Sequence, residues 1–328
     1  MRKFIFEAGL GVFTSFKTLI PVENLEYIKA RDSHRYHIYG ILAYDQAFFK
    51  KEKTYTTEKG INIGLFTVNN GEEKEYELPL WTIAPDLDHN NVEVKISFPP
   101  TMMNICIKDE NFLKQHPEFV RSELDIMAQD LFQSVAECLI EKQEFEVLYI
   151  GQAYGKDGER TAFDRLEQHS TLQKILTTYR SSHPDKHIYI LLLEFQEQLT
   201  MSFDGISKEY ARTEEESDIH MEEVCSNLPK GNQVINITEA ALINYFKPEY
   251  NVNFVENFPN ENHKGYKQYF DLDYNALTVE LDLEFDNAPI IQLYTATNRI
   301  NSSFDFIQYR LFNDNERNDM YEIFKKDE

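Results

Sequence analysis

One nearly continuous apolar run, HIYILLLEF at residues 187–195, constrains the fold of this chain more than any other segment. Its composition is typical of a strand whose two faces are both buried. Such a strand needs a sheet with packing partners on both sides. The chain is long enough to supply them, because 328 residues with 42% hydrophobic content can bury a sizeable core.

Further strand signals concentrate toward the two ends of the chain. Runs rich in β-branched and aromatic residues occur at 35–44, 61–68 and 92–98, and apolar and acidic residues alternate at 277–285. We therefore predict an α+β protein. The predicted regions are a β-rich N-terminal region (1–105), a connecting helix (106–142), a mixed middle region (143–255) and a β-rich C-terminal region (256–328). The two β-rich ends either join into one domain with the middle inserted or form separate pieces.

The middle region and its flanks carry the helical signals. Apolar residues recur at helical spacing, and Pro248 ends the last helix of this part. The predicted elements are a helix over 118–142, a strand over 145–151, a loop over 153–159, a helix over 162–180 and a short helix over 239–247 with Thr238 as its N-cap. The acidic segment EEESDIHMEE at 214–223 has no apolar period, so it is either a solvated loop or an exposed helix.

The charge balance restricts the partners of the chain. The sequence has 33 basic and 56 acidic residues and a net charge of −23. This argues against an extended basic surface for nucleic acid, because phosphate binding depends on Lys and Arg. A local site remains open, since residues 151–190 carry six basic against five acidic side chains. In this stretch Lys156 and Arg160 are candidates for contacts with a phosphate backbone.

Hydropathy and cysteine content indicate the compartment. No stretch approaches the ~20 apolar residues that a membrane span needs. The three cysteines, Cys106, Cys138 and Cys225, lie far apart and form no CxxC pair. Such a scattered set is typical of reduced thiols. We therefore expect a cytoplasmic protein without membrane contact.

Two candidate functional residues, Tyr149 and Glu239, stand in unusual local settings. Tyr149 begins the sequence YIG at a strand end, where Gly151 permits a sharp turn and leaves the surface around the tyrosine open. Glu239 shares the apolar stripe of its helix with Leu242 and Phe246. A carboxylate on an apolar stripe is costly unless a metal, a cation or hydrogen bonds compensate for it. Glu239 therefore indicates a site.

Arg165 and His169 are the second pair of candidates. Thr161 and Asp164 form a start of the capping-box type, which puts Arg165 in the first full turn of its helix. His169 follows four residues later, so we expect both side chains to project from one helix face. This face is expected near the strand end that carries Tyr149.

Taken in order, these stretches resemble the GIY-YIG nuclease family. LYIGQA is similar to the YIG half of the family name, FDRLEQH to its arginine-bearing helix, and TEAALINYFKPEYN to its glutamate helix and closing asparagine. The resemblance covers roughly residues 143–255. It implies a small mixed or antiparallel sheet with flanking helices, embedded between the β-rich ends. It also implies a metal-dependent endonuclease that hydrolyses DNA or RNA, with DNA favoured as the partner.

The resemblance also implies roles for individual residues. The implied cofactor is one divalent ion, Mg²⁺ or Mn²⁺. By position, Glu239 would hold the ion, Tyr149 would orient or deprotonate water, Arg165 would contact the phosphate, His169 would assist proton transfer or phosphate binding, and Asn251 would position the site or the nucleic-acid backbone, with Lys156 and Arg160 as further nucleic-acid contacts.

One family feature is not found where it is expected. A GIY-like strand with its own tyrosine should lie shortly before YIG, but the predicted helix over 118–142 occupies that stretch. The strand either comes from further upstream, with VEVKISF at 92–98 as a candidate, or has been lost. The alternative function is a nuclease-derived binding or assembly module that no longer cuts and meets protein partners through its β-rich flanks.

Overall fold

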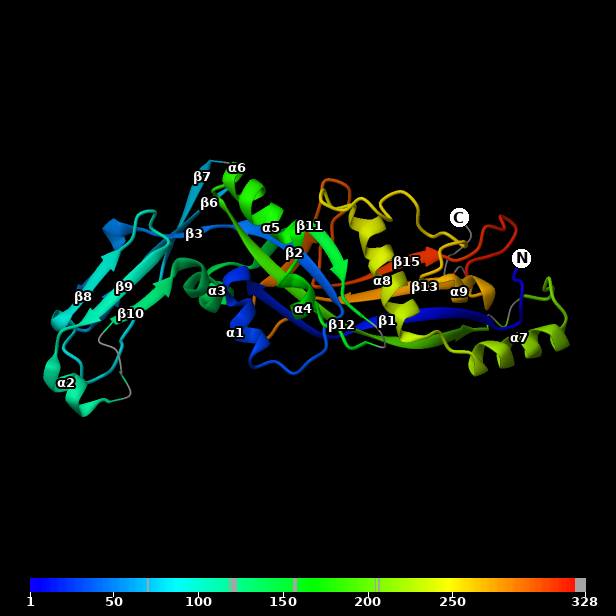
Figure 1. Cartoon of the computed structure of the whole chain (residues 1–328), viewed down its shortest axis with the longest axis horizontal. Helices are drawn as coiled ribbons and strands as arrows, with labels where there is room; N and C mark the ends of the chain where they lie inside the picture. The colour runs from blue at the N-terminus through cyan, green and yellow to red at the C-terminus, as the bar shows by residue number, and fades with distance from the viewer. Residues whose placement is uncertain are drawn as a thin grey trace.

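A seven-stranded mixed sheet forms the centre of the molecule (Figure 1). The computed structural model describes residues 1–69, 71–117, 119, 123–155, 158–203, 205 and 207–321. Across the sheet the strand order is β14-β11-β2-β12-β1-β13-β15. The strands are β1 (Glu7–Pro21), β2 (Ile38–Asp45), β11 (Lys142–Gln152), β12 (Lys186–Ser202), β13 (Ala276–Asp282), β14 (Ile290–Tyr294) and β15 (Phe304–Arg310). The chain is thus a mixed α+β protein, although this sheet is larger than the small sheet that the resemblance implies.

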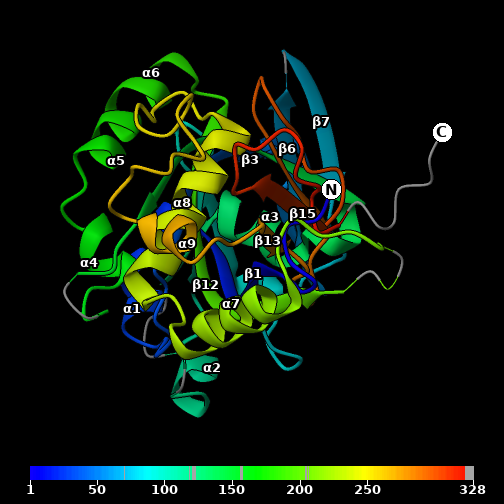
Figure 2. The ribbon, with the colours of Figure 1, turned by 90° about the vertical axis from the view of Figure 1, so that its right-hand side faces the viewer.

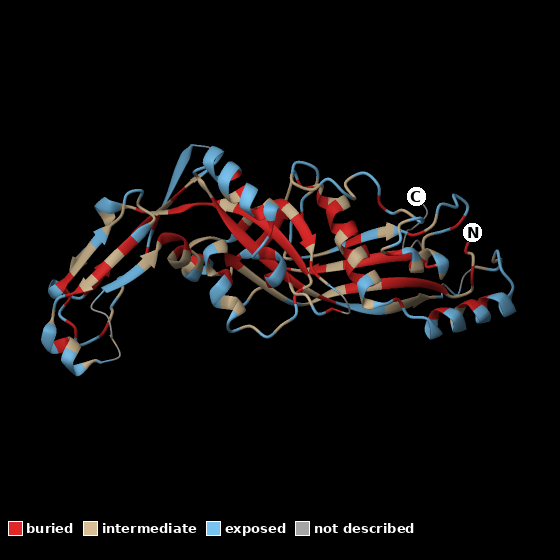
Figure 3. Ribbon diagram, in the orientation of Figure 1, coloured by how far each residue is buried: buried red, intermediate tan, exposed pale blue. Residues whose placement is uncertain are grey.

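The apolar run at 187–195 forms the middle of β12, which pairs with β2 on one side and β1 on the other. Alternate side chains of a strand point to opposite faces of the sheet. One face receives Ile188, Ile190 and Leu192 in one core cluster, and the other receives Tyr189, Leu191 and Leu193 in a second cluster. The prediction of a strand buried on both faces is therefore confirmed, and Figure 3 shows the buried residues along these central strands.

Helices cover both faces of this sheet. The helix α8 packs its buried residues into one core cluster, whereas α4 and α5 pack theirs into the other. In the end-on view α4, α5 and α6 lie together on one side of the molecule (Figure 2). The helices are α1 (Leu25–Lys29), α4 (Ala162–Leu166), α5 (Ser170–Lys174), α6 (Arg180–Ser182), α7 (Glu214–Ser226), α8 (Gly231–Phe246) and α9 (Lys267–Asp271), with a π-helical turn at Ile175–Tyr179.

Three helix predictions need correction or completion. The predicted helix over 162–180 is broken between α4 and α5. The predicted helix over 239–247 begins earlier, at Gly231, so Thr238 lies inside α8 and its hydroxyl donates to the carbonyl of Val234 at 2.8 Å instead of capping the helix. The acidic segment at 214–223 belongs to the exposed helix α7, which was one of its two open alternatives.

Residues 46–141, which we call the inserted lobe, lie between β2 and β11 and have their own core. The lobe contains β3 (Ala47–Phe49), β4 (Tyr55–Thr57), β5 (Gly60–Asn62), β6 (Gly64–Asn69), β7 (Glu72–Glu77), β8 (Val92–Ile96), β9 (Met102–Ile107), β10 (Glu123–Met127), α2 (Glu110–Gln115) and α3 (Ala128–Leu139). It forms one end of the elongated molecule, and the N-terminus lies at the other (Figure 1).

The predicted helix over 118–142 is wrong in its first part. Residues Glu123–Met127 form β10, which pairs antiparallel with β9, and the helix α3 starts only at Ala128. Pairing with a neighbouring strand has here overridden a local apolar pattern that also fits a helix. Residues 118 and 120–122 lie outside the described part of the chain.

The large sheet takes strands from three of the four regions expected from the sequence. Strand β1 pairs in parallel with β13 and antiparallel with β12. The two ends of the chain and its middle region therefore share one sheet. The proposed region boundaries stay a prediction. In the described ranges no helix combines the length and the apolar character needed to cross a membrane.

The two chain ends are held together by a buried ion-pair cluster, which we call the terminal clasp. Its centre is the carboxylate of Glu7, which is 0% exposed and is paired with Arg317. The backbone N–H groups of Lys3 and Phe4 also donate to Glu7, at 2.8 and 3.3 Å. Arg317 donates in addition to Asp273 at 2.6 Å. Each charge of the clasp thus has a close partner.

Candidate functional site

The candidate site begins with two tyrosines on neighbouring strands. β2 and β11 pair antiparallel, with Tyr39 opposite Gly151 and Ile41 opposite Tyr149. The ring centroids of Tyr39 and Tyr149 lie 6.2 Å apart. Tyr39 therefore occupies the place beside YIG where the resemblance implies a second tyrosine.

Tyr39 was missed because the inserted lobe separates it from YIG in the chain. The upstream candidate VEVKISF at 92–98 is wrong, since Val92–Ile96 forms β8 in a separate sheet of the lobe. The stretch HIYG at 37–40 carries the signal, a tyrosine followed by glycine within a β-rich run. A search of all upstream strands for a tyrosine would have found it.

Gly151 is needed for close packing of the two tyrosines. A Cβ atom on this residue would lie 2.6 Å from both Cζ and the hydroxyl oxygen of Tyr39, and 2.7 Å from Cε1 of Tyr149. These distances are too short for any real side chain. The expected sharp turn at Gly151 is absent, because β11 continues through it to Gln152. Because glycine has no Cβ, the rings of both tyrosines can pack against the backbone at Gly151.

Arg165 reaches this pair from α4. The predicted helix start is confirmed: the backbone N–H and the hydroxyl of Thr161 both donate to the carboxylate of Asp164, at 3.0 and 2.9 Å. Arg165 is exposed, and its positive charge acts on the Tyr39 hydroxyl. Burial raises the pKa of Tyr39 and so does the neighbouring Tyr149, while Arg165 opposes the shift.

His169 lies at the site by a different route from the one expected. The helix ends before it, and its Nδ1 accepts from the backbone N–H of Leu172 at 3.0 Å as the N-cap of α5. Its ring stands edge-on to Tyr149 and Tyr39, at 5.0 and 5.6 Å between centroids. Burial, with the charge of Arg165, lowers the pKa of His169 to about 4. At neutral pH the imidazole is uncharged and carries its proton on Nε2, so it is a hydrogen-bond donor.

Glu239 faces the same groups from α8. Its side chain is partly buried, and burial raises the pKa of Glu239 to about 8, against hydrogen bonds from Gln152 and the charge of Arg165. Burial is the main reason why the pKa of Tyr149 is raised, and the Glu239 carboxylate is the second reason. The structure thus brings Tyr39, Tyr149, Arg165 and Glu239 within electrostatic reach of one another, although they come from four separate elements.

Gln152 is a second residue that the sequence reasoning did not single out. It follows YIG directly, and its side-chain amide donates to Oδ1 of Asn236 on α8 at 2.8 Å. Hydrogen bonding from Gln152 also opposes the rise in the pKa of Glu239. Gln152 therefore connects the end of β11 to α8 beside this carboxylate.

Asn251 is committed to the backbone of β11. Its Oδ1 accepts from the N–H of Ile150 at 2.9 Å, and its Nδ2 donates to the carbonyl of Ile150 at 2.8 Å. The N–H of Tyr250 adds a bond to the carbonyl of Leu148 at 3.1 Å. These contacts hold the strand on both sides of Tyr149. They fit the expected positioning role, and a nucleic-acid contact by Asn251 stays a prediction.

The two expected basic contacts differ in what the structure describes. Arg160 is partly exposed, and its backbone N–H donates to the carbonyl of Tyr154 at 3.1 Å in the loop after β11. Lys156 lies outside the described residues. Arg160 is thus on the rim of the site, two residues before α4.

The donor set for a metal ion consists of one carboxylate. Across the described residues there is no group of three or more His, Cys, Asp or Glu side chains that could hold a metal. Mg²⁺ commonly binds through one or two carboxylates and completes its shell with water and phosphate oxygens. The single carboxylate of Glu239, once deprotonated, fits that arrangement.

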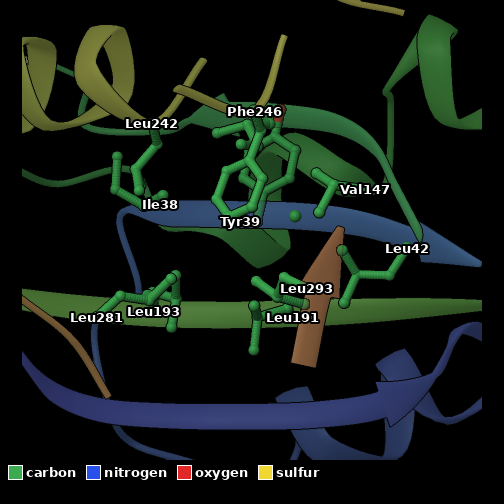
Figure 4. Close-up of a pocket in the computed structure, with 12 residues that line it drawn as sticks. Ile38, Tyr39, Leu42, Val147, Leu191, Leu193, Leu242, Phe246, Leu281 and Leu293 are labelled. Carbon is green, nitrogen blue, oxygen red and sulfur yellow. The ribbon is translucent and has the colours of Figure 1, made fainter. Parts of the chain in front are cut away.

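A small cavity adjoins the site beneath α8 but has a different character (Figure 4). It has a volume of about 20 Å³ and lies between Leu242 and Phe246 of α8 and the strands of the sheet. Apart from Tyr39 its lining side chains are aliphatic or aromatic hydrocarbon groups, including Val147 and Leu191. A cavity of this size and polarity has room for about one water and no polar partners to hold it. It is a packing defect of the core.

Comparisons with known proteins do not extend these observations. No protein-family model, no curated protein and no solved structure matches the chain. Any functional conclusion therefore depends on the geometry of the site itself.

Proposed function

We propose that the chain is a metal-dependent endonuclease that hydrolyses phosphodiester bonds of DNA or RNA through a site similar to that of the GIY-YIG nucleases. One observation carries the proposal: two tyrosines, an exposed arginine and a partly buried carboxylate from β2, β11, α4 and α8 lie within electrostatic reach of one another at the end of β11. Gly151 and Asn251 are both engaged in holding this arrangement.

Glu239 would be the protein ligand of Mg²⁺ or Mn²⁺. A bound divalent ion supplies Lewis acidity and lowers the pKa of a coordinated water. Because burial raises the pKa of Glu239 to about 8, its carboxyl group must lose a proton before it can serve as a ligand. The affinity for the ion should therefore rise with pH up to about pH 8 and then level off.

The two tyrosines would act first as hydrogen-bonding groups. Burial raises the pKa of both, so both are protonated at neutral pH. Tyr149 is the more exposed of the two and would orient the attacking water, while Tyr39 would hold the Tyr149 hydroxyl in place. Deprotonation of Tyr149 becomes favourable only when added positive charge lowers its pKa.

Arg165 and His169 would bind the phosphate. A guanidinium presents paired N–H donors that fit two phosphate oxygens. His169 is 3% exposed, and its Nδ1 is occupied by the backbone, so only its Nε2–H remains to donate. This makes a phosphate hydrogen bond the better assignment for His169 than proton transfer.

A second function, a binding module that no longer cuts, is favoured by a different observation. Tyr39 is 1% exposed, and the pKa of Glu239, raised to about 8 by burial, favours its neutral form at neutral pH. The net charge of −23 also disfavours unspecific binding of nucleic acid. Such a module would keep the tyrosines, Arg165 and Glu239 but would not hydrolyse nucleic acid.

A metal-dependence panel tests the proposal. Single- and double-stranded DNA and RNA are incubated with wild type, Glu239→Gln and the control Glu249→Gln, with Mg²⁺, Mn²⁺ or EDTA. We expect cleavage by wild type and the control only with metal, and a loss of roughly 100-fold or more in Glu239→Gln. Undiminished cleavage by Glu239→Gln would remove the mechanism, and binding without cleavage by wild type would support the second function.

A further inference from the structure

The described arginines differ in whether a carboxylate lies within ion-pair distance of the guanidinium. Five form ion pairs with carboxylates, and Arg2 donates to backbone carbonyls of Ser202 and Met320. The ion pairs are Arg180 with Glu23, Arg212 with Glu216, Arg299 with Glu144, Arg310 with Asp319, and Arg317 with Glu7 and Asp273. The other four, Arg31, Arg35, Arg160 and Arg165, have no carboxylate within ion-pair distance in the described part of the chain.

These four arginines lie on two segments that run side by side. The N–H of Ala162 donates to the carbonyl of Tyr36, and the N–H of Ala153 donates to the carbonyl of His37, both at 2.8 Å. An ion pair between Lys29 and Glu167 adds a third link. Both views place α1 next to α4 (Figures 1 and 2).

All four side chains remain accessible. Arg31, Arg35 and Arg165 are exposed, and Arg160 is partly exposed. The guanidinium of Arg31 lies 3.6 Å from the ring centroid of Tyr27, which is itself 57% exposed. A planar cation on an exposed aromatic ring is held in place without being covered.

Most nearby carboxylates are already engaged. Asp32 accepts from the hydroxyl of Tyr36 and from His34, each at 2.7 Å. Asp164 accepts from Thr161, and Glu167 pairs with Lys29. On residues 31–37 and 158–169 this leaves Glu159 as the one carboxylate with no such partner in the described structure. In formal charge the four arginines of these two stretches equal their four carboxylates, so this part of the surface is neutral on a strongly acidic protein.

We propose that Arg31, Arg35, Arg160 and Arg165 form one arginine track that binds the phosphate backbone of a nucleic-acid strand several nucleotides long and leads it into the site. This inference rests on the proposed function. His37 is two residues before Tyr39, and Arg165 belongs to both the track and the site, so the track is continuous with the tyrosine pair. An acidic protein segment would meet the same charges, but this continuity with the candidate phosphodiester site favours nucleic acid.

Binding measurements on a double variant test the track. Arg31→Ala/Arg35→Ala is compared with Arg212→Ala/Lys267→Ala, which removes the same charge from exposed helix ion pairs. The probes are fluorescein-labelled 20-nucleotide single strands and duplexes of DNA and RNA, and anisotropy is recorded in EDTA over a range of salt concentrations. The four probes show which nucleic acid is bound.

Loss of two phosphate contacts should weaken binding by on the order of tenfold and lower the slope of log affinity against log salt by about 1.4 for a single strand. The control variant should keep the wild-type affinity and slope. Equal affinity of both double variants, with unchanged thermal unfolding, would overturn the track. Polyglutamate is the competing probe: if wild type prefers polyglutamate to every oligonucleotide, the partner is an acidic protein and the proposal is wrong.

The same samples separate this inference from the proposed function. If wild type cuts nucleic acid with Mg²⁺ or Mn²⁺ but Arg31→Ala/Arg35→Ala binds as wild type does, the track is wrong and the nuclease assignment stands. If wild type binds with the expected salt dependence but never cuts, the track stands and the nuclease assignment fails.

Discussion

Two carboxylates of this molecule, the buried Glu7 and the partly buried Glu239, have opposite surroundings. Glu7 in the terminal clasp is paired with Arg317 and accepts two backbone N–H groups. Glu239 has Gln152 as its hydrogen-bonding partner, and no cation lies within ion-pair distance of it in the described residues. Burial leaves its pKa near 8.

The difference separates a structural charge from a candidate functional one. A buried carboxylate with a complete set of partners ties segments together, and removing it leaves an uncompensated opposite charge. A carboxylate that is desolvated but has no cationic partner keeps its proton to higher pH, and an incoming cation can replace that proton. Burial of a carboxylate alone therefore does not indicate a functional site. The lack of a cationic partner for that carboxylate does.

The largest expected effect comes from breaking the terminal clasp. Glu7→Gln should lower the free energy of unfolding by about 3–5 kcal/mol, because Arg317 loses its buried partner. Glu239→Gln should lower it little or raise it. Urea unfolding of both variants at pH 8 measures the contrast. An equal decrease in the free energy of unfolding of the two variants would show that both carboxylates have the same structural role.

The pH dependence of stability sharpens the same contrast. The pKa of Glu239 is raised from 4.5 to about 8, so the folded state holds a proton that the unfolded state releases between these values. The stability of wild type should therefore fall relative to Glu239→Gln as pH rises from about 4.5 to 8, by up to a few kcal/mol, and then level off. Urea midpoints of both proteins in EDTA at pH 5, 6.5, 8 and 9 measure this, and a constant difference would contradict the raised pKa.

Gly151→Ala tests the packing of the tyrosine pair. The added methyl would press on both rings and should cost about 1–3 kcal/mol of unfolding free energy, with a parallel loss of cleavage. Gly11→Ala on β1 is the matched control, because its Cβ would meet its neighbours at 3.4 Å or more. The measurement is the thermal unfolding of both variants. Similar stability of the two would mean that the tyrosine rings can move away from the added methyl group without cost.

The smallest expected effect concerns Asn251. Asn251→Ala removes both bonds to Ile150 and should cost about 1–2 kcal/mol, while kcat falls more than KM changes because Tyr149 is displaced. The exposed Asn253 provides the control substitution to alanine. If Asn251→Ala instead raised KM alone, direct contact with the nucleic acid would be the better assignment.

Several parts of the site could be predicted from neighbouring residues. Tyr149, Arg165 and Glu239 stand out because each has an unusual local setting, and the capping pair Thr161 and Asp164 was read correctly. The break after α4 could not be predicted, because His169 leaves the helix to cap α5 and packs edge-on to Tyr149. Tyr39 was missed because the inserted lobe removes it from the neighbourhood of YIG.

The sequence by itself determined the doubly buried strand β12, the solvent-facing acidic character of residues 214–223 and part of the site, including Tyr149, Arg165 and Glu239. These follow from periodicity and from the chemistry of adjacent residues. Only the tertiary structure decided that β2 is the partner of β11, that Gly151 lies against Tyr39, and that Arg31 and Arg35 lie on a segment beside that of Arg160 and Arg165. Strand pairing and burial join residues far apart in the chain, and their energies depend on neighbours that no local pattern specifies.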